Sequence, residues 1–110
     1  MFTGATARIR ANSGFAAFAG AKFALRALAQ SMAKELGPHG IHVIHPIIDG
    51  PIDTAFIRDR IGNDEMFSQL KQADLLLNPD AIANEYFHLH QQPRAVWTHE
   101  LDLRPYGEKF

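Results

Sequence analysis

The hydrophobic residues between Phe15 and Leu36 recur at the spacing of a helix. They fall at steps of three, four and seven residues, namely Phe15, Phe18, Leu25, Ala29, Met32 and Leu36. This period predicts one helix with a buried face, with capping groups at Asn12–Gly14 in front and a stop at Gly37–Pro38. Alanine and glycine fill much of its remaining surface. We therefore expect this helix to lie in an interior or a subunit interface.

The next apolar run, Ile41–Ile48, is short and rich in β-branched residues, which is typical of a strand covered on both faces. Pro46 has no N–H to donate to a sheet, so the paired part is predicted to end near His45. The following Asp49–Pro51 has the composition of a turn.

The second half of the chain predicts two helices and one strand. A short helix is expected around Glu65 to Asp74, and a longer one begins with Asn78 as its cap and runs to about Gln91. Alternating residues from Val96 to Leu103 predict a strand. Helices alternate with strands in this order, which favours an α/β fold with a parallel sheet flanked by helices.

Composition and charge argue against several classes of function. The 110 residues are 46% hydrophobic and 21% charged, which suits one globular domain. A net charge of −1 without runs of like charge argues against nucleic acid as a partner. No apolar stretch reaches the roughly 20 residues that cross a bilayer, and no basic leader precedes an apolar run, so no membrane partner and a cytoplasmic location are expected. The absence of cysteine excludes disulfides.

The six histidines do not predict a metal site. His42 and His45 would point to opposite faces of a strand, whereas His88 and His90 diverge around a helix. Neither pair could chelate a metal alone.

Lys22 interrupts the apolar face of the predicted long helix. A half-buried ammonium group needs a partner, or it extends its methylenes along the face to reach water. Arg26, Gln30 and Lys34 follow at four-residue steps, so Lys22 could also begin a polar stripe. Periodicity leaves both interpretations open.

Three blocks of the chain carry motifs in a recognisable order. They are Thr3–Thr6 followed by Gly14–Leu25, then Leu36–Val43, and then Asp49–Thr54, which looks like a Pro-Gly-x-(Ile/Val)-x-Thr segment. In order and spacing they resemble the C-terminal half of the short-chain dehydrogenase/reductase family, over essentially the whole chain. The resemblance implies a partial Rossmann-like sheet in which Met1–Ala5 ends the fifth strand and Ile41–Ile48 is the sixth.

On this resemblance, residues 1–110 form a single partial domain. The family's glycine-rich turn, which holds the cofactor's pyrophosphate, is not found in this sequence. We expect the first four strands to lie upstream, so that a sheet edge is exposed and the long helix is partly uncovered.

The resemblance also implies a site on the long helix. The family places a Tyr-x-x-x-Lys pair there, in which lysine binds the nicotinamide ribose and lowers the pKa of the tyrosine that passes a proton. Lys22 matches the lysine, but Phe18 stands at the tyrosine position and has no proton to give. The family's serine position falls on Ala5, so Thr3 or Thr6 could substitute only if the loop is shifted.

The segment after the second predicted strand supplies the other candidates. Asp49 replaces the family's proline and is either a substitute acid or base, or a turn residue. Gly50, Ile52 and Thr54 match the family's cofactor-binding segment. Thr54 could alternatively cap a helix that begins at Ala55.

The resemblance implies an oxidoreductase that uses NAD or NADP to transfer hydride to or from a small carbonyl or alcohol substrate, with the isolated chain inactive. It also implies a homo-oligomer formed through the helix Phe15–Leu36. Two alternatives stay open at this point. The chain could be a non-catalytic binding or oligomerisation module, or an autonomous small domain with an unrelated fold.

Overall fold

The computed structural model describes residues 1–5 and 16–108. A parallel sheet of three strands lies at its centre, in the order β1 (Gly4–Ala5), β2 (His45–Ile48) and β3 (Glu100–Leu103). Gly4 pairs with Ile47, and His45 pairs with Glu100. The predicted α/β fold with a partial Rossmann-like parallel sheet is therefore confirmed, and so is the placement of the first residues in a strand beside Ile41–Ile48.

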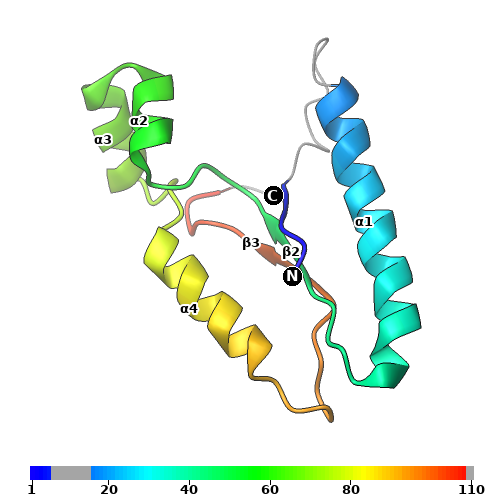
Figure 1. Ribbon diagram of the computed structural model, residues 1–110. Helices are drawn as coiled ribbons and strands as arrows, with labels where there is room; N and C mark the ends of the chain where they lie inside the picture. Colours follow the sequence, from blue (N-terminus) through cyan, green and yellow to red (C-terminus); the bar gives the residue numbers. More distant parts are fainter. Residues whose placement is uncertain (6–15, 109–110) are drawn as a thin grey trace.

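Four helices surround this sheet: α1 (Ala16–Leu36), α2 (Ala55–Ile61), α3 (Asp64–Gln72) and α4 (Pro79–His90). The strands lie between α1 on one side and α4 on the other, and α2 and α3 pack together apart from α1 (Figure 1). Because β1 and β2 are parallel, the chain must return along α1, so the N-terminal end of α1 lies beside the carboxyl ends of the strands.

Helix α1 ends where the sequence predicts. Leu36 is its last residue, Gly37–His39 form a single 3₁₀ turn, and Gly40 has the left-handed φ of 81° that favours glycine. The predicted caps at residues 12–14, together with Phe15, lie outside the described residues. Within this chain α1 is not an interior helix, because among its residues only Ala29 is buried. Its role in a subunit interface stays a prediction.

The predicted pairing of the second strand is wrong. Pairing begins at His45 and continues through Pro46 to Ile48. The reason is that a parallel strand directs alternate residues to its two neighbours. His45 and Asp49 donate their N–H groups to carbonyls of His99 and Leu103 on the β3 side. Pro46 therefore faces the short strand β1, where its missing donor does not interrupt the bonds to β3.

The later elements follow the predictions in part. Helix α4 begins after its cap Asn78 and α3 overlaps the expected short helix, whereas α2 was expected only as the helix that Thr54 could alternatively cap. The last strand is shorter than expected, because Val96–His99 lie outside it and the Val96 N–H donates to Pro93 in a turn.

The core is small and follows the sheet. Its buried hydrophobic residues come from all parts of the described chain and are Ala29, Val43, Ile44, Ile48, Phe67, Leu77 and Leu89. Among the described residues, the polar side chain of His45 is buried as well, at 3% exposure. In residues 1–5 and 16–108, no helix is long and apolar enough to cross a membrane.

Candidate functional site

The carboxyl ends of the three strands meet at one edge of the sheet. Asp49 follows β2 and Arg104 follows β3 at this edge. Open α/β sheets bind their ligands outside the carboxyl ends of the strands. The predicted segment Asp49–Thr54 therefore begins where this architecture places a ligand.

Lys22 lies at a cavity between α1 and the strands β1 and β2. The cavity has a volume of about 50 Å³, and its lining residues are Gly4, Ala5, Ala19, Lys22, Phe23, Arg26, His45 and Ile47. Lys22 is half-buried, and its Nζ is 5.5 Å from the centre of the Phe18 ring. Among the described residues, no carboxylate forms an ion pair with Lys22. Its ammonium group is thus held beside the sheet without a neutralising partner in that part of the chain.

Phe18 lies one turn before Lys22 and is 47% exposed. Its contact with Lys22 confirms that positions four residues apart share a helix face. The ring offers no proton, so the structure brings together the two family positions without the acid that one of them normally carries.

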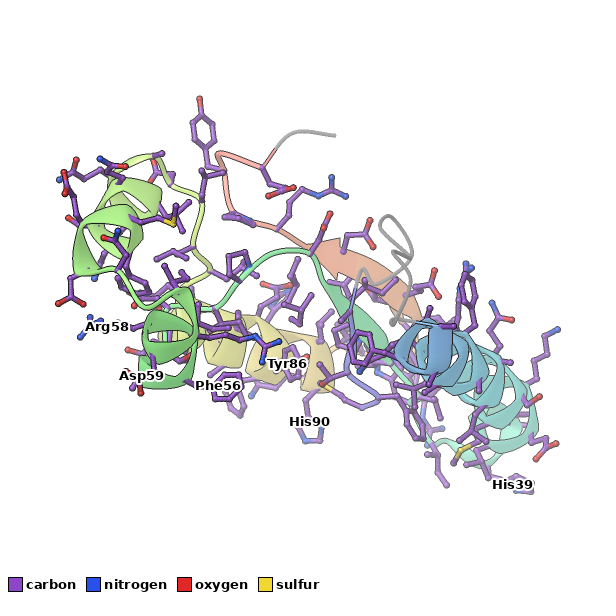
Figure 2. The ribbon with its side chains drawn as sticks, turned by 90° about the horizontal axis from the view of Figure 1, so that it is seen from above. His39, Phe56, Arg58, Asp59, Tyr86 and His90 are labelled. Carbon is purple, nitrogen blue, oxygen red and sulfur yellow. The ribbon has the colours of Figure 1, made fainter. Side chains whose placement is uncertain are left out.

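Of the two threonine candidates, the structure describes Thr3, which is not brought to Lys22. Thr6 lies outside the described residues. The Thr3 hydroxyl is 2.9 Å from the hydroxyl of Tyr86, and Tyr86 comes from α4, on the opposite side of the strands from α1 (Figure 2). Thr3 therefore joins β1 to α4 rather than serving the cavity beside Lys22.

Asp49 forms an ion pair that the sequence did not predict. Its Oδ2 is 3.7 Å from Nη1 of Arg104, and the side chain of Asp49 is only 14% exposed. Arg104 also binds Asp102 at 2.9 Å, and both Asp49 and Arg104 make further contacts. The ion pair ties the residue that follows β2 to the residue that follows β3 at the sheet edge.

Gly50 and Ile52 shape the loop that leaves this edge. Gly50 has a φ of 148°, and a Cβ there would lie 2.9 Å from the Cδ of Pro105, so the site favours glycine. Ile52 forms a single parallel bridge with Leu77. The loop is therefore tied to the segment that precedes α4.

Thr54 caps α2. Its hydroxyl oxygen accepts a hydrogen bond from the N–H of Ile57 at 3.3 Å and donates to the carbonyl of Ile52 at 3.4 Å. The cap interpretation of Thr54 is thus confirmed, whereas a contact with a cofactor stays a prediction.

Replacing the Thr54 hydroxyl tests the cap directly. We expect Thr54→Ala to lower the free energy of unfolding by about 1 kcal/mol, since α2 loses its side-chain acceptor. Thr54→Ser keeps the hydroxyl and should stay close to the wild type. Urea denaturation measures both variants, and an equal loss for the two would show that the hydroxyl does not stabilise α2.

Sequence reasoning missed a network that joins α1 to the sheet. Arg26 makes two hydrogen bonds to the carboxylate of Glu100, at 2.9 and 3.0 Å, and Nδ1 of His45 lies 3.2 Å from the same carboxylate. The hydrogen bond from Arg26 holds the pKa of Glu100 below its usual value. The signal was the polar stripe on α1, but its partner is 74 residues away.

The histidines make contacts with the protein. His42 Nε2 lies 2.7 Å from the carbonyl of Thr98, and its ring stacks on Trp97. His99 Nδ1 lies 3.0 Å from the carbonyl of Val43. In the part of the chain that the structure describes, no group of three or more His, Cys, Asp or Glu residues could hold a metal ion.

Comparison with known proteins finds one family model that matches this chain. This model, described as Enoyl-(Acyl carrier protein) reductase, matches residues 1–98. No curated protein and no solved structure gives a match. The matched residues include α1 with Lys22, the whole of β2, and the loop that carries Gly50 and Thr54. By this match over most of its length, the chain belongs to the short-chain dehydrogenase/reductase family.

Proposed function

We propose that this chain is the C-terminal half of an NAD- or NADP-dependent oxidoreductase that transfers hydride to or from a small carbonyl or alcohol substrate. The observation that carries the proposal is the position of Lys22. It lies on the helix that the family uses for its lysine, beside β1, and no carboxylate in the described residues neutralises it.

The residues present fit the nicotinamide end of a dinucleotide. Lys22, which no carboxylate of residues 1–5 and 16–108 neutralises, offers a donor for ribose hydroxyls, and Gly50 brings a backbone without a side chain to the carboxyl edge of the sheet. The bound cofactor supplies the hydride chemistry, while the protein supplies binding and orientation. The pyrophosphate would be held by a glycine-rich turn that this sequence does not contain. For this reason we expect the chain alone to bind dinucleotide weakly and to be inactive.

Proton transfer is where this chain departs from its family. Phe18 cannot donate a proton, and Asp49 is bound to Arg104. Lys22 can still orient the ligand and place a positive charge near a developing oxyanion. We propose that the chain retains the binding half of the family's Tyr-x-x-x-Lys pair and lacks its usual acid.

Lys22→Met tests the proposal in the longer protein that the proposal implies, with this chain as its C-terminal half. We expect the variant to weaken NADH or NADPH binding about 10- to 100-fold, the effect of losing a charged hydrogen bond. Lys34→Met removes the same charge from the same helix three turns later and serves as the control. Isothermal titration measures affinity, and oxidation of NADH or NADPH with a panel of carbonyl compounds measures turnover. Equal affinity for the two variants would overturn the role of Lys22.

A non-catalytic oligomerisation module is the second candidate, and the surface of α1 supports it. Phe18, Phe23 and Leu28 are each about half exposed on a helix that is otherwise rich in alanine. Exposed apolar side chains on a helix with so many small residues suit contact with a second copy of the chain. Reproducible, substrate-dependent oxidation of NADH or NADPH by the longer protein would exclude a module without activity.

A further inference from the structure

Three charged or polar side chains connect α1 to the far strand of the sheet. Glu100 on β3 accepts two hydrogen bonds from the guanidinium of Arg26 on α1. The same Oε2 that faces Arg26 Nε lies 3.2 Å from Nδ1 of His45 on β2. The network therefore spans the helix and two strands, and both Arg26 and His45 line the cavity of Lys22.

His45 contacts Glu100 through Nδ1, which lies 3.2 Å from Oε2 of that carboxylate. Because the Glu100 carboxylate accepts, Nδ1 of His45 carries the hydrogen in this contact. Its other nitrogen, Nε2, is buried without a hydrogen-bond partner in the described residues. That atom abuts Gly4, where an added Cβ would lie only 2.5 Å from it.

The orientation of α1 depends on few contacts within the described residues. Ala29 is the only buried residue of this helix, so packing alone gives a weak constraint on its rotation. A planar guanidinium that binds a carboxylate with two parallel bonds adds a directional constraint. Arg26 is one turn after Lys22, and residues four apart lie on the same helix face. The two hydrogen bonds that fix Arg26 to Glu100 therefore also fix the direction of Lys22.

We propose that Arg26, Glu100 and His45 form a positioning network that sets the rotation of α1 and holds Lys22 at the cavity beside Gly4 and Ala5. Its importance for catalysis rests on the proposed function, since Lys22 is there the cofactor contact. The positioning itself does not depend on a cofactor and can be measured without one.

Competitive acylation of the lysines in the 110-residue chain tests the network. A water-soluble acyl ester is used in trace amount, and mass spectrometry of the peptides gives a separate rate for Lys22, Lys34 and Lys71. Lys34 and Lys71 are exposed and serve as internal standards. We expect Glu100→Gln to raise the rate of Lys22 severalfold, toward that of Lys34, while the standards stay unchanged. Circular dichroism checks that the variant is folded.

Two further variants separate positioning from charge and from folding. Asp102→Asn removes a carboxylate from the same strand, but this carboxylate binds Arg104 and not α1, so Lys22 should keep its wild-type rate. Arg26→Lys keeps the positive charge but loses the pair of parallel hydrogen bonds to Glu100. Acylation of Lys22 should therefore proceed at an intermediate rate. If Glu100→Gln does not fold, Arg26→Lys decides: an intermediate rate supports the network, and a wild-type rate overturns it.

The proposal is also overturned if Glu100→Gln leaves the rate of Lys22 unchanged, if Asp102→Asn raises it equally, or if all lysines become faster together. No nucleotide is present in these measurements. Failure of the network is therefore distinct from failure of the proposed function, which the titration of Lys22→Met reports.

Discussion

On the proposed function, Phe18→Tyr is expected to raise the turnover of the longer protein about 10²- to 10⁴-fold, the usual contribution of a positioned general acid. Phe18 already lies one helical turn from Lys22, whose Nζ is 5.5 Å from the ring centre. A phenol at this position would have an ammonium group nearby, and a positive charge lowers the pKa of a tyrosine hydroxyl. The measurement is the oxidation of NADH or NADPH with the best carbonyl compound of the panel.

Two controls show whether the gain comes from the new hydroxyl and its lysine. Leu28→Tyr adds a phenol to the same helix, but at an exposed position ten residues from Phe18 that does not line the cavity beside Lys22, so it should not raise turnover. Adding Lys22→Met to Phe18→Tyr should remove most of the gain, because the two groups act as a unit. Turnover unchanged by Phe18→Tyr would mean that another group of the protein supplies the proton.

The elements that the sequence predicted best are those with local signals. Helix α4 begins after Asn78, whose Oδ1 accepts a hydrogen bond from the N–H of Ala81 at 3.0 Å. Helix α1 ends before Gly37 and Pro38. Caps and stops act over three or four residues, so a single sequence contains all the information that they need.

Strand pairing was harder to predict because it depends on neighbours that are distant in sequence. The sequence predicted that pairing ends near His45, because Pro46 lacks an N–H. Whether that missing N–H matters depends on which neighbouring strand Pro46 faces. Helix α2 was expected only as the helix that Thr54 could alternatively cap, although Gly62 also stops it with a left-handed φ of 68°. The irregular hydrophobic pattern after Ile52 outweighed these two local signals.

In the candidate site too, residues of one local motif could be predicted, whereas contacts between distant residues could not. Lys22 and Phe18 were found because both lie in one motif on one helix. The partners of Asp49 and Arg26 are Arg104 and Glu100, which are more than 50 residues away along the chain. Only the parallel sheet brings them together, since it sets β3 beside β2 at the same edge. The charges that act on the candidate site therefore could not be assigned from spacing.

Leu89→Ala is expected to cost about 2–5 kcal/mol of the free energy of unfolding. Leu89 is 2% exposed and is one of the largest fully buried side chains in the described residues. It lies in the last turn of α4, the helix on the side of the sheet opposite α1. Small domains are stable by only about 5–15 kcal/mol, so this one truncation should remove a large share of the stability.

Phe87→Ala is the matched control, because Phe87 lies on the same helix two residues earlier and is 62% exposed. We expect its cost to stay below about 1 kcal/mol, although it removes more atoms than Leu89→Ala. Urea denaturation followed by circular dichroism gives both values, with equal slopes indicating that the unfolded states are comparable. A cost for Leu89→Ala as small as that for Phe87→Ala would contradict the burial of Leu89 in the core.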